Sequence, residues 1–142
     1  MVDPAIMGPM DLFRIAGEHA LELPATELTH PFGAGWDVYR VKDKMFCVLS
    51  HPEENPQRVP MVIVKAIPEE GERLRARYAE ITPGYHMNKV HWNSIVDGPG
   101  ISENLVRDLI TDSYLAVVAG LPRAKRPVDP ENHGLRQFGA GF

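Results

Sequence analysis

The sequence predicts one α+β domain of two layers, a two-layer α/β sandwich with the helices on one face of an antiparallel sheet. Along the chain, the apolar residues change between helical and alternating spacing in the order α-β-β-β-α-β-β-α. Strands that follow one another without an intervening helix favour antiparallel pairing, with the helices gathered on one face. A chain of 142 residues also fits a single domain, which can bury a core without disulfides.

The first helix is predicted from Asp11, whose carboxylate can accept hydrogen bonds from the unpaired amides of the first turn. Apolar residues recur at helical spacing as far as Leu21, and Pro24 bounds the helix. The preceding residues 1–10 are interpreted as a flexible lead-in. Residues 24–35, which are rich in proline and glycine, are interpreted as a loop.

Three strands are predicted next, at residues 36–41, 45–49 and 61–67. The first two are rich in β-branched and aromatic residues, and the turn between them falls around Asp43-Lys44. The third is an almost continuous apolar run, which predicts a central strand because both of its faces would be buried. A polar loop punctuated by prolines separates the second strand from the third.

A charged helix over residues 69–80 is expected to bury only the stripe formed by Leu74, Tyr78 and Ile81. Arginines and glutamates alternate along the rest of this segment, so its outer face is interpreted as solvated and ion-paired. The helix is therefore predicted to cover the sheet with a single apolar face.

The segment Thr82-Pro83-Gly84-Tyr85 predicts a tight turn in which Gly84 adopts a positive φ. A strand from about Tyr85 to Trp92 is predicted after this turn, and it is followed by a second strand near residues 94–96 or continues into that segment as one bent strand. This part of the chain completes the predicted sheet.

Ser102 is predicted to cap the last helix, with Ile101 and Val106 forming a hydrophobic staple across its first turn. Gly120 and Pro122 are predicted to end this helix, because neither residue favours its continuation. The last predicted element thus supplies a broad apolar face to the core.

The predicted domain spans residues 11–121. Residues 122–142 are rich in proline, glycine and charge, and are interpreted as a weakly ordered tail. The tail begins with Arg123, Lys125 and Arg126, which could add a basic arm, although the acidic residues that follow favour a solvated end without function.

The composition restricts the class of protein. The formal net charge of −4 and the pI near 5.8 mean that any nucleic-acid surface must be local, since dedicated nucleic-acid binders usually carry a basic excess. The single cysteine, Cys47, excludes an internal disulfide. No apolar run is long enough to span a membrane, and residues 1–10 lack the features of a signal peptide, so we expect a cytoplasmic protein without a membrane partner.

The most distinctive run of the chain is Pro83-Gly84-Tyr85-His86-Met87-Asn88-Lys89-Val90-His91-Trp92. Together with Lys44-Met45-Phe46 and Ser113-Tyr114-Leu115-Ala116-Val117, it resembles the motifs of the MmcQ/YjbR-like family. The resemblance covers roughly residues 11–121. The sequence departs from the family pattern at Asp43, where a glycine is common, and in a longer proline-rich segment at residues 52–60.

The resemblance implies an α-β-β-β-α-β-β-α fold related to the secretion-chaperone-like and frataxin-like architectures. It also implies a DNA-binding role. Because the sequence shows no catalytic constellation, we expect a protein without enzymatic activity. Association with a protein partner or with a second copy is the alternative function, by analogy with secretion chaperones.

No catalytic residue, metal site or cofactor is predicted. On a regular strand His86 and His91 would lie on opposite faces, which argues against a zinc pair. Cys47 lies mid-strand among apolar residues, where a thiol is usually a small buried hydrophobic group. The polar residues of the His86–Trp92 segment are interpreted as groups that hydrogen-bond the loop backbone, with a small-molecule site there as a further alternative.

The strands and their hairpin turn, taken as segments 36–49, 61–67 and 84–96, carry a local excess of positive charge. Five cations lie in these segments against the two anions Asp37 and Asp43, and the cations are Arg40, Lys42, Lys44, Lys65 and Lys89. We therefore hypothesise weak, sequence-tolerant nucleic-acid binding through the open sheet face and its hairpin edge. The phosphate-binding residues would be Arg40, Lys42, Lys44 and Lys89, and the stacking residues Tyr85 and His91. The competing interpretation is that the lysines only protect a sheet edge from pairing.

Overall fold

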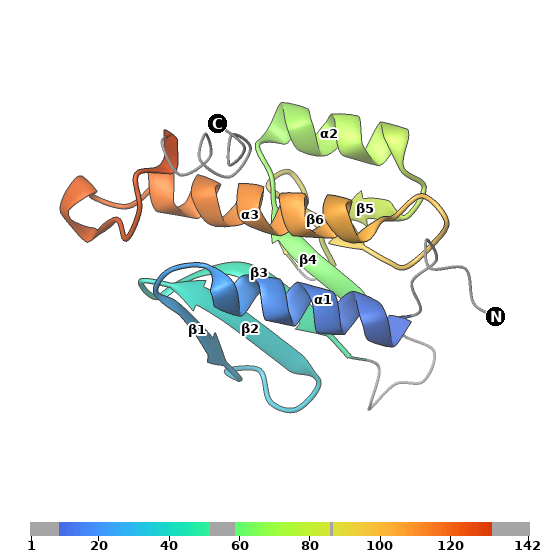
Figure 1. Ribbon diagram of the computed structural model, residues 1–142. Coiled ribbons are helices and arrows are strands. Elements are labelled where there is room, and N and C mark those ends of the chain that lie inside the picture. The colour runs from blue at the N-terminus through green and yellow to red at the C-terminus, as the bar shows by residue number, and fades with distance from the viewer. Residues whose placement is uncertain (1–8, 52–58, 86, 132–142) are drawn as a thin grey trace.

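The computed structural model describes residues 9–51, 59–85 and 87–131 of the chain (Figure 1). Within these residues the helices are α1 (Pro9–Glu22), α2 (Pro68–Arg77), α3 (Glu103–Ala119) and the short 3₁₀ helix η1 (Arg123–Lys125). The strands are β1 (Thr26–Thr29), β2 (Trp36–Val41), β3 (Lys44–Ser50), β4 (Met61–Lys65), β5 (Ile81–Pro83) and β6 (Trp92–Ile95). The predicted α+β class and order of elements are confirmed, with β1 as an additional strand.

The strands form one six-stranded sheet in the order β1-β2-β3-β4-β6-β5, and every neighbouring pair is antiparallel. As predicted from its apolar run, β4 lies inside the sheet, between β3 and β6. α1 and α3 pack against each other across β3 and β4, and α2 packs on β5 and β6 (Figure 1). Asn93 of β6 is paired with Val64 of the main core, so its side chain lies on the same face of the sheet as the core. Asn93 donates a hydrogen bond to the Gly71 carbonyl of α2, so α2 lies on the same face as α1 and α3.

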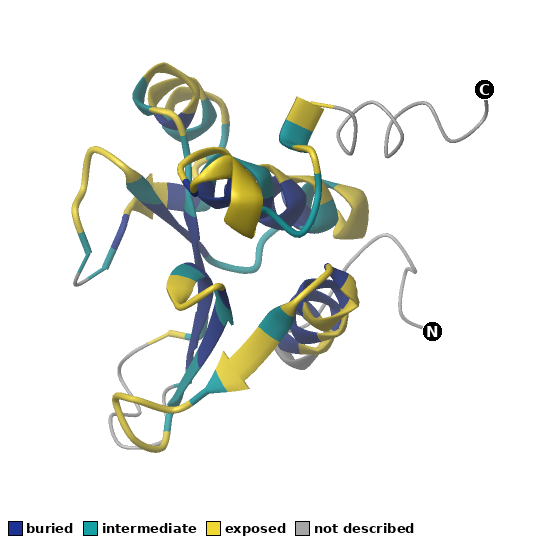
Figure 2. Cartoon of the chain, turned by 90° about the vertical axis from the view of Figure 1, so that its left-hand side faces the viewer, coloured by how far each residue is buried: buried dark blue, intermediate teal, exposed yellow. Residues whose placement is uncertain are grey.

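The main core fills the space between the helices and the sheet (Figure 2). Leu12 and Ile15 of α1 are fully buried in it, and the rings of Phe46 in β3 and Tyr114 in α3 meet edge to face at 5.2 Å. Cys47 is fully buried, as predicted, and burial raises the pKa of its thiol. This thiol therefore stays neutral and lacks the thiolate character of a nucleophile.

α3 is fastened to the sheet by Ser113. The Ser113 hydroxyl accepts a hydrogen bond from the Lys65 amide at 2.8 Å and donates one to the Phe46 carbonyl at 2.5 Å. The pairing of β3 with β4 begins at Cys47 and Val64. Ser113 therefore bonds backbone groups one residue beyond this end of the paired strands. The Tyr114 hydroxyl donates to the Pro24 carbonyl at 2.6 Å. The Ser113-Tyr114 part of the final motif thus has a structural role.

The two long helices begin in different ways. α1 begins at Pro9, so the prediction that Asp11 is its N-cap is wrong; Asp11 lies in the first turn, where Arg14 is 3.7 Å from its carboxylate. A proline suits a first turn because its missing N–H would have no partner within the helix. The prediction for α3 is confirmed, since the Ser102 hydroxyl accepts a hydrogen bond from the Leu105 amide at 3.1 Å.

Two local predictions differ from the structure. The loop predicted at residues 24–35 contains the edge strand β1, whose side chains are exposed or half-buried and carry no strong alternation. Backbone pairing with β2 forms this strand, so its side chains gave no signal. The predicted helix 69–80 ends at Arg77, because Tyr78 is already extended, and Ile81 belongs to β5.

Parts of three other predictions fall outside the described residues. These parts are residues 1–8 of the predicted lead-in, residues 52–58 of the proline-rich loop and residues 132–142 of the predicted tail. The beginning of the predicted tail is described, and its Val128 packs against the main core.

The β2–β3 hairpin turns through Lys42 and Asp43, both of which have positive φ angles of 48° and 68°. Two consecutive residues of this kind make the hairpin turn that usually contains Asn-Gly or Asp-Gly. Neither pair occurs at this point, which explains why the turn type could not be predicted. A glycine would adopt the φ of Asp43 without the strain that a Cβ causes there.

Asp43→Gly is expected to stabilise the protein by about 0.5–1 kcal/mol, because glycine adopts this φ without a Cβ clash. Arg40 donates to the backbone carbonyl of Asp43 at 3.1 Å, a bond that the substitution preserves. Urea denaturation measures the change in the free energy of unfolding. Lys44→Gly, inside β3, is the control and should destabilise; a lower urea midpoint for Asp43→Gly would contradict the assigned turn.

Candidate nucleic-acid interface

The face of the sheet opposite the helices has a small apolar cluster of its own. Val38, Val48 and Ile63 are buried at its centre, one from each of β2, β3 and β4. Partly buried side chains pack over them, namely Trp36, Met45, Met61, Tyr85, Met87 and Trp92. In Figure 2 the β5–β6 loop lies on the side of the sheet away from α1 and α3. This face is therefore partly covered.

The β5–β6 loop, residues 84–91, contains most of the distinctive motif, and the predicted strand from Tyr85 to Trp92 is wrong. The side-chain oxygen of Asn88 accepts hydrogen bonds from the amides of Val90 at 2.9 Å and His91 at 3.3 Å. An asparagine that bonds the backbone ahead of it stabilises a turn and competes with strand pairing. His86 lies outside the described residues, and His91 lies in this loop and not in a strand. The expectation that the two histidines lie on opposite faces of a regular strand therefore does not apply.

Other bonds brace the same loop. Gly84 donates its amide to the Trp92 carbonyl at 2.7 Å, and Tyr85 donates its amide to the Ser94 hydroxyl at 2.8 Å. The Lys89 ammonium donates to the Gly84 carbonyl at 3.2 Å. The interpretation that these polar residues hold the loop backbone is supported for Asn88 and Lys89.

Gly84 is required for a reason that differs from the predicted one. The described glycines with positive φ are Gly33 and Gly35, so the prediction of a positive φ at Gly84 is wrong. Pro83 also belongs to β5 rather than to a tight turn. A Cβ on Gly84 would lie 2.6 Å from the Cβ of Trp92, closer than two carbon atoms that are not bonded to each other can approach. Glycine is therefore required by the close approach of two chain segments.

Three of the predicted phosphate-binding residues meet at the β2–β3 hairpin. Lys42 and Lys44 are exposed, and Arg40 points along the hairpin, with Nε 3.3 Å from the Thr29 hydroxyl and Nη1 3.1 Å from the Asp43 carbonyl. The predicted residues Lys89, Tyr85 and His91 lie instead in the β5–β6 loop. Tyr85 is half-buried and stacks on Trp36, with ring centroids 6.4 Å apart.

The chain after α3 brings further cations to the hairpin. One shallow depression is lined by Lys42 and Asp43 from the hairpin and by residues 124–127 from η1 and its end. Arg126 donates to the Ala119 carbonyl at 2.7 Å and to the Leu121 carbonyl at 2.9 Å, which fixes this segment to the end of α3. Figure 1 shows η1 and the hairpin at the same end of the molecule.

We name this surface the basic tip, and it consists of Arg40, Lys42, Lys44, Arg123 and Lys125. Among the residues that the structure describes, its two lysines on the hairpin and its two cations on η1 have no ion-pair partner. Anions also lie beside it: Asp43 and Glu27 line depressions together with Lys42, and Asp129 and Glu131 line one together with Arg123. The sequence identified the hairpin cations, whereas Arg123 and Lys125 were assigned to a solvated tail.

A second polar group was not predicted. The Asp37 carboxylate lies between two imidazoles, with His30 Nε2 at 3.0 Å and His51 Nε2 at 2.8 Å. Within the described part of the chain, no group of three or more His, Cys, Asp or Glu side chains is arranged to hold a metal ion. Asp37, counted as a free anion of the strands, is in fact paired with histidines.

The described helices include none that is both long and apolar enough to cross a membrane. The fold and the surfaces above define a small two-layer α+β domain with an antiparallel sheet, a braced β5–β6 loop and a basic hairpin tip. The comparisons with known proteins agree with this class.

The YjbR family model matches residues 21–116, and the chain belongs to that family. It is 42% identical over 117 residues to the uncharacterized protein YbdF of Escherichia coli O157:H7, covering 82% of this chain and 93% of that protein. It is 30% identical over 87 residues to the uncharacterized protein YjbR of Escherichia coli K12, covering 61% of this chain and 70% of YjbR.

Two solved structures share the fold. The crystal structure of Deinococcus radiodurans protein DR2400 matches with a TM-score of 0.69 and 29% identity, covering 88% of this chain and 89% of that one. A protein from Pseudomonas syringae matches with a TM-score of 0.53 and 31% identity, over 62% of this chain and 83% of that one.

Proposed function

We propose that this protein is a non-enzymatic nucleic-acid-binding protein that contacts the phosphate backbone through the basic tip. The observation that carries the proposal is the depression shared by Lys42 of the hairpin and Lys125 of η1. It joins cations that are distant in the sequence into one surface, in a chain whose net charge is −4. Exposed cations bind phosphates and release counterions, and this term does not depend on sequence.

The aromatic side chains of the open face would have a secondary role. Trp36 and Tyr85 are stacked with an interplanar angle of 4°, and Phe32 meets Trp36 edge to face at 6.3 Å. Phe32 is 55% exposed, so an unpaired base could stack against this row. Lys89 and His91, both exposed on the β5–β6 loop, remain predicted contacts of the same strand of nucleic acid.

The expected result is weak binding whose affinity falls steeply with salt. Phosphate contacts from the four exposed cations of the basic tip, Lys42, Lys44, Arg123 and Lys125, predict a slope of about −3 to −4 for log K against log salt, since each contact contributes roughly −0.7 to −0.9. Lys42→Ala with Lys44→Ala should reduce the steepness by about 1 to 2, equally for unrelated sequences. Fluorescence anisotropy with labelled single- and double-stranded oligonucleotides measures these slopes.

The matched control removes two cations elsewhere. Arg73→Ala with Arg77→Ala gives the same net charge as the lysine double variant, but both residues are exposed on α2. The slope of log K against log salt for this arginine double variant should equal that of the unmodified protein. Equal losses in both double variants would show that only net charge matters, and absence of binding at about 100 μM protein would overturn the proposal, because non-specific binding is typically in the 10⁻⁴–10⁻⁶ M range.

Association with a protein partner or a second copy is the second candidate, favoured by the same aromatic row. Phe32, Trp36 and Tyr85 form a partly exposed apolar surface on the open sheet face. Apolar docking has little dependence on salt, in contrast to phosphate binding. Sedimentation analysis at low and high salt therefore separates the two: a dimer that persists at high salt and dissociates in Phe32→Ser supports self-association.

A further inference from the structure

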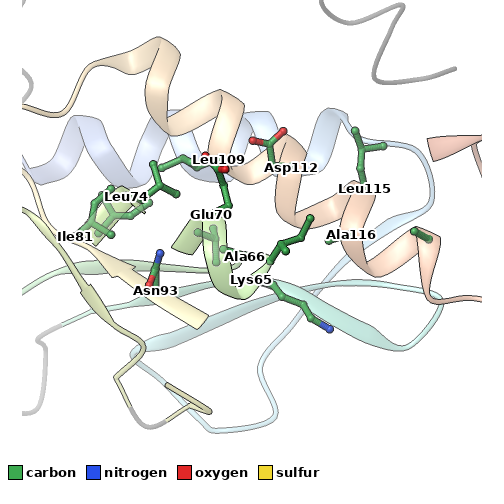
Figure 3. A pocket seen from close by; sticks show the side chains of 14 residues that line it. Lys65, Ala66, Glu70, Leu74, Ile81, Asn93, Leu109, Asp112, Leu115 and Ala116 are labelled. Atoms are coloured by element: carbon green, nitrogen blue, oxygen red, sulfur yellow. The ribbon is translucent and has the colours of Figure 1, made fainter. Parts of the chain in front are cut away.

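A cavity of about 320 Å³ lies between α2, α3 and the strands beneath them (Figure 3). It exists because α2 packs on β5 and β6 but not closely on α3. α2 lies close to the sheet at Gly71, its buried residue, where a Cβ would meet Ala66 and Asn93 at 3.4 Å. Glu70 and Leu74, on either side of this glycine, line the cavity.

The walls of this cavity are apolar. Leu74 of α2, Ile81 of β5 and Leu109 and Leu115 of α3 face it from different sides. A volume of this size is at the lower end of the range of small-molecule sites, which are typically about 300–1,000 Å³ and mostly apolar with a few polar groups. The cavity thus fits the body of a small apolar molecule.

Two carboxylates line the cavity, besides the polar side chains of Lys65 and Asn93. Glu70 of α2 and Asp112 of α3 lie at the same side of it, and Figure 3 shows both carboxylates there. The Lys65 ammonium, in contrast, points away from the cavity in the same view. The negative charge at this side of the cavity is therefore not balanced by the lysine that lines it.

Asp112 lacks a partner of opposite charge. It makes no hydrogen bond or ion pair with the residues that the structure describes, whereas Glu70 pairs with Arg73 at 3.2 Å. Partial burial of the carboxyl, and then the negative charges of Asp108 and Glu70, together raise the pKa of Asp112 to about 6. Asp112 is an exposed residue at the edge of the cavity, so a ligand can reach its carboxylate.

We propose that this cavity binds a small amphiphilic amine, with the apolar body among Leu74, Ile81 and Leu109 and the ammonium group between Asp112 and Glu70. The apolar walls supply affinity through burial, and the carboxylates select a cation over a neutral group of the same shape. This site is formed by other elements than the basic tip, so it does not depend on the proposed nucleic-acid binding.

The affinity for an amine follows the ionisation of Asp112. Its pKa is about 6, so the affinity should rise as the pH increases from about 5 to 7, while the amine itself stays protonated. A neutral alcohol with the same apolar body should show no such rise. The pH dependence thus distinguishes a specific ion pair from apolar binding alone.

The test compares 4-phenylbutylamine with 4-phenylbutanol, titrated into the full-length chain and followed by NMR chemical shifts. At pH 7 the amine should bind about fivefold more tightly than the alcohol, the ratio that a partly exposed ion pair supplies. Asp112→Asn should abolish this preference while the alcohol still binds. Asp108→Asn, which makes the same charge change one turn earlier on α3 and outside the cavity lining, should retain it.

The results that would overturn the proposal are equally specific. Equal affinities for amine and alcohol, an unchanged preference in Asp112→Asn, or shifts located away from α2 and α3 would each contradict it. If neither compound bound at millimolar concentration, that result would also contradict the proposal. Thermal unfolding of both variants confirms that they are folded before the titrations.

Discussion

Ser113→Ala is expected to destabilise the protein by about 2–4 kcal/mol. The serine hydroxyl bonds both the Lys65 amide and the Phe46 carbonyl, and it is fully buried. Removing it leaves two backbone groups without partners at the end of the β3–β4 ladder, and each buried group left unsatisfied costs about 1–3 kcal/mol. Urea denaturation followed by circular dichroism measures the loss.

The matched control is Ser102→Ala on the same helix. Ser102 caps α3 at the surface, and loss of such a cap costs typically about 1 kcal/mol. Ser113→Ala should therefore be clearly the more destabilising of the two. A loss for Ser113→Ala no larger than that for Ser102→Ala would mean that the buried hydroxyl does not hold α3 on the sheet.

Gly84→Ala is expected to destabilise by about 1–3 kcal/mol, the usual range for an added group that overpacks a closely packed site. The new Cβ would lie 2.6 Å from the Cβ of Trp92 and 3.0 Å from its carbonyl oxygen, and it would disturb the Gly84–Trp92 hydrogen bond. The β5–β6 loop should then separate from β6, which tryptophan fluorescence can detect.

Gly120→Ala is the control for this substitution. Gly120 has a φ of −81°, and its Cβ would have its nearest neighbour at 3.4 Å. An alanine there should change the free energy of unfolding little. If Gly84→Ala gave the same urea midpoint as Gly120→Ala, the close contact between Gly84 and Trp92 would not exist.

Much of the fold could be predicted because strong patterns lie in the buried strands. The predicted strand 36–41 has the bounds of β2, and the apolar run at Met61 to Lys65 identified β4 as an inner strand. β1 could not be predicted, because an edge strand is formed by backbone bonds and its side chains remain outside the core. The side chains of a strand do not predict it when backbone hydrogen bonds to a neighbouring strand are what form it.

The β5–β6 loop shows a different limit. Residues 85–92 contain aromatic and apolar residues in a strand-like order, but Asn88 bonds the amides ahead of it and forms a turn. Such a local bond competes with strand formation and is invisible to a pattern of hydrophobicity. The sequence predicted a positive φ at Gly84, whereas the constraint that the structure shows there is the tertiary contact with Trp92.

The candidate sites were predictable only in part. Lys42 and Lys44 follow from their place in a hairpin, whereas the position of Lys125 depends on how Arg126 bonds the end of α3. Asp112 occupies an exposed position of a long helix, and only the separation of α2 from α3 places it beside a cavity. Both sites depend on contacts between elements distant in the sequence.

Binding of nucleic acid at the basic tip is tested most directly by an NMR titration of the isotopically labelled protein with a short single-stranded oligonucleotide at low salt. We expect the largest amide shifts at residues 42–44 and 123–126, and we expect them to disappear when salt is raised. Largest shifts at α2 or at the cavity, or no shifts at about 100 μM protein, would contradict binding at the basic tip.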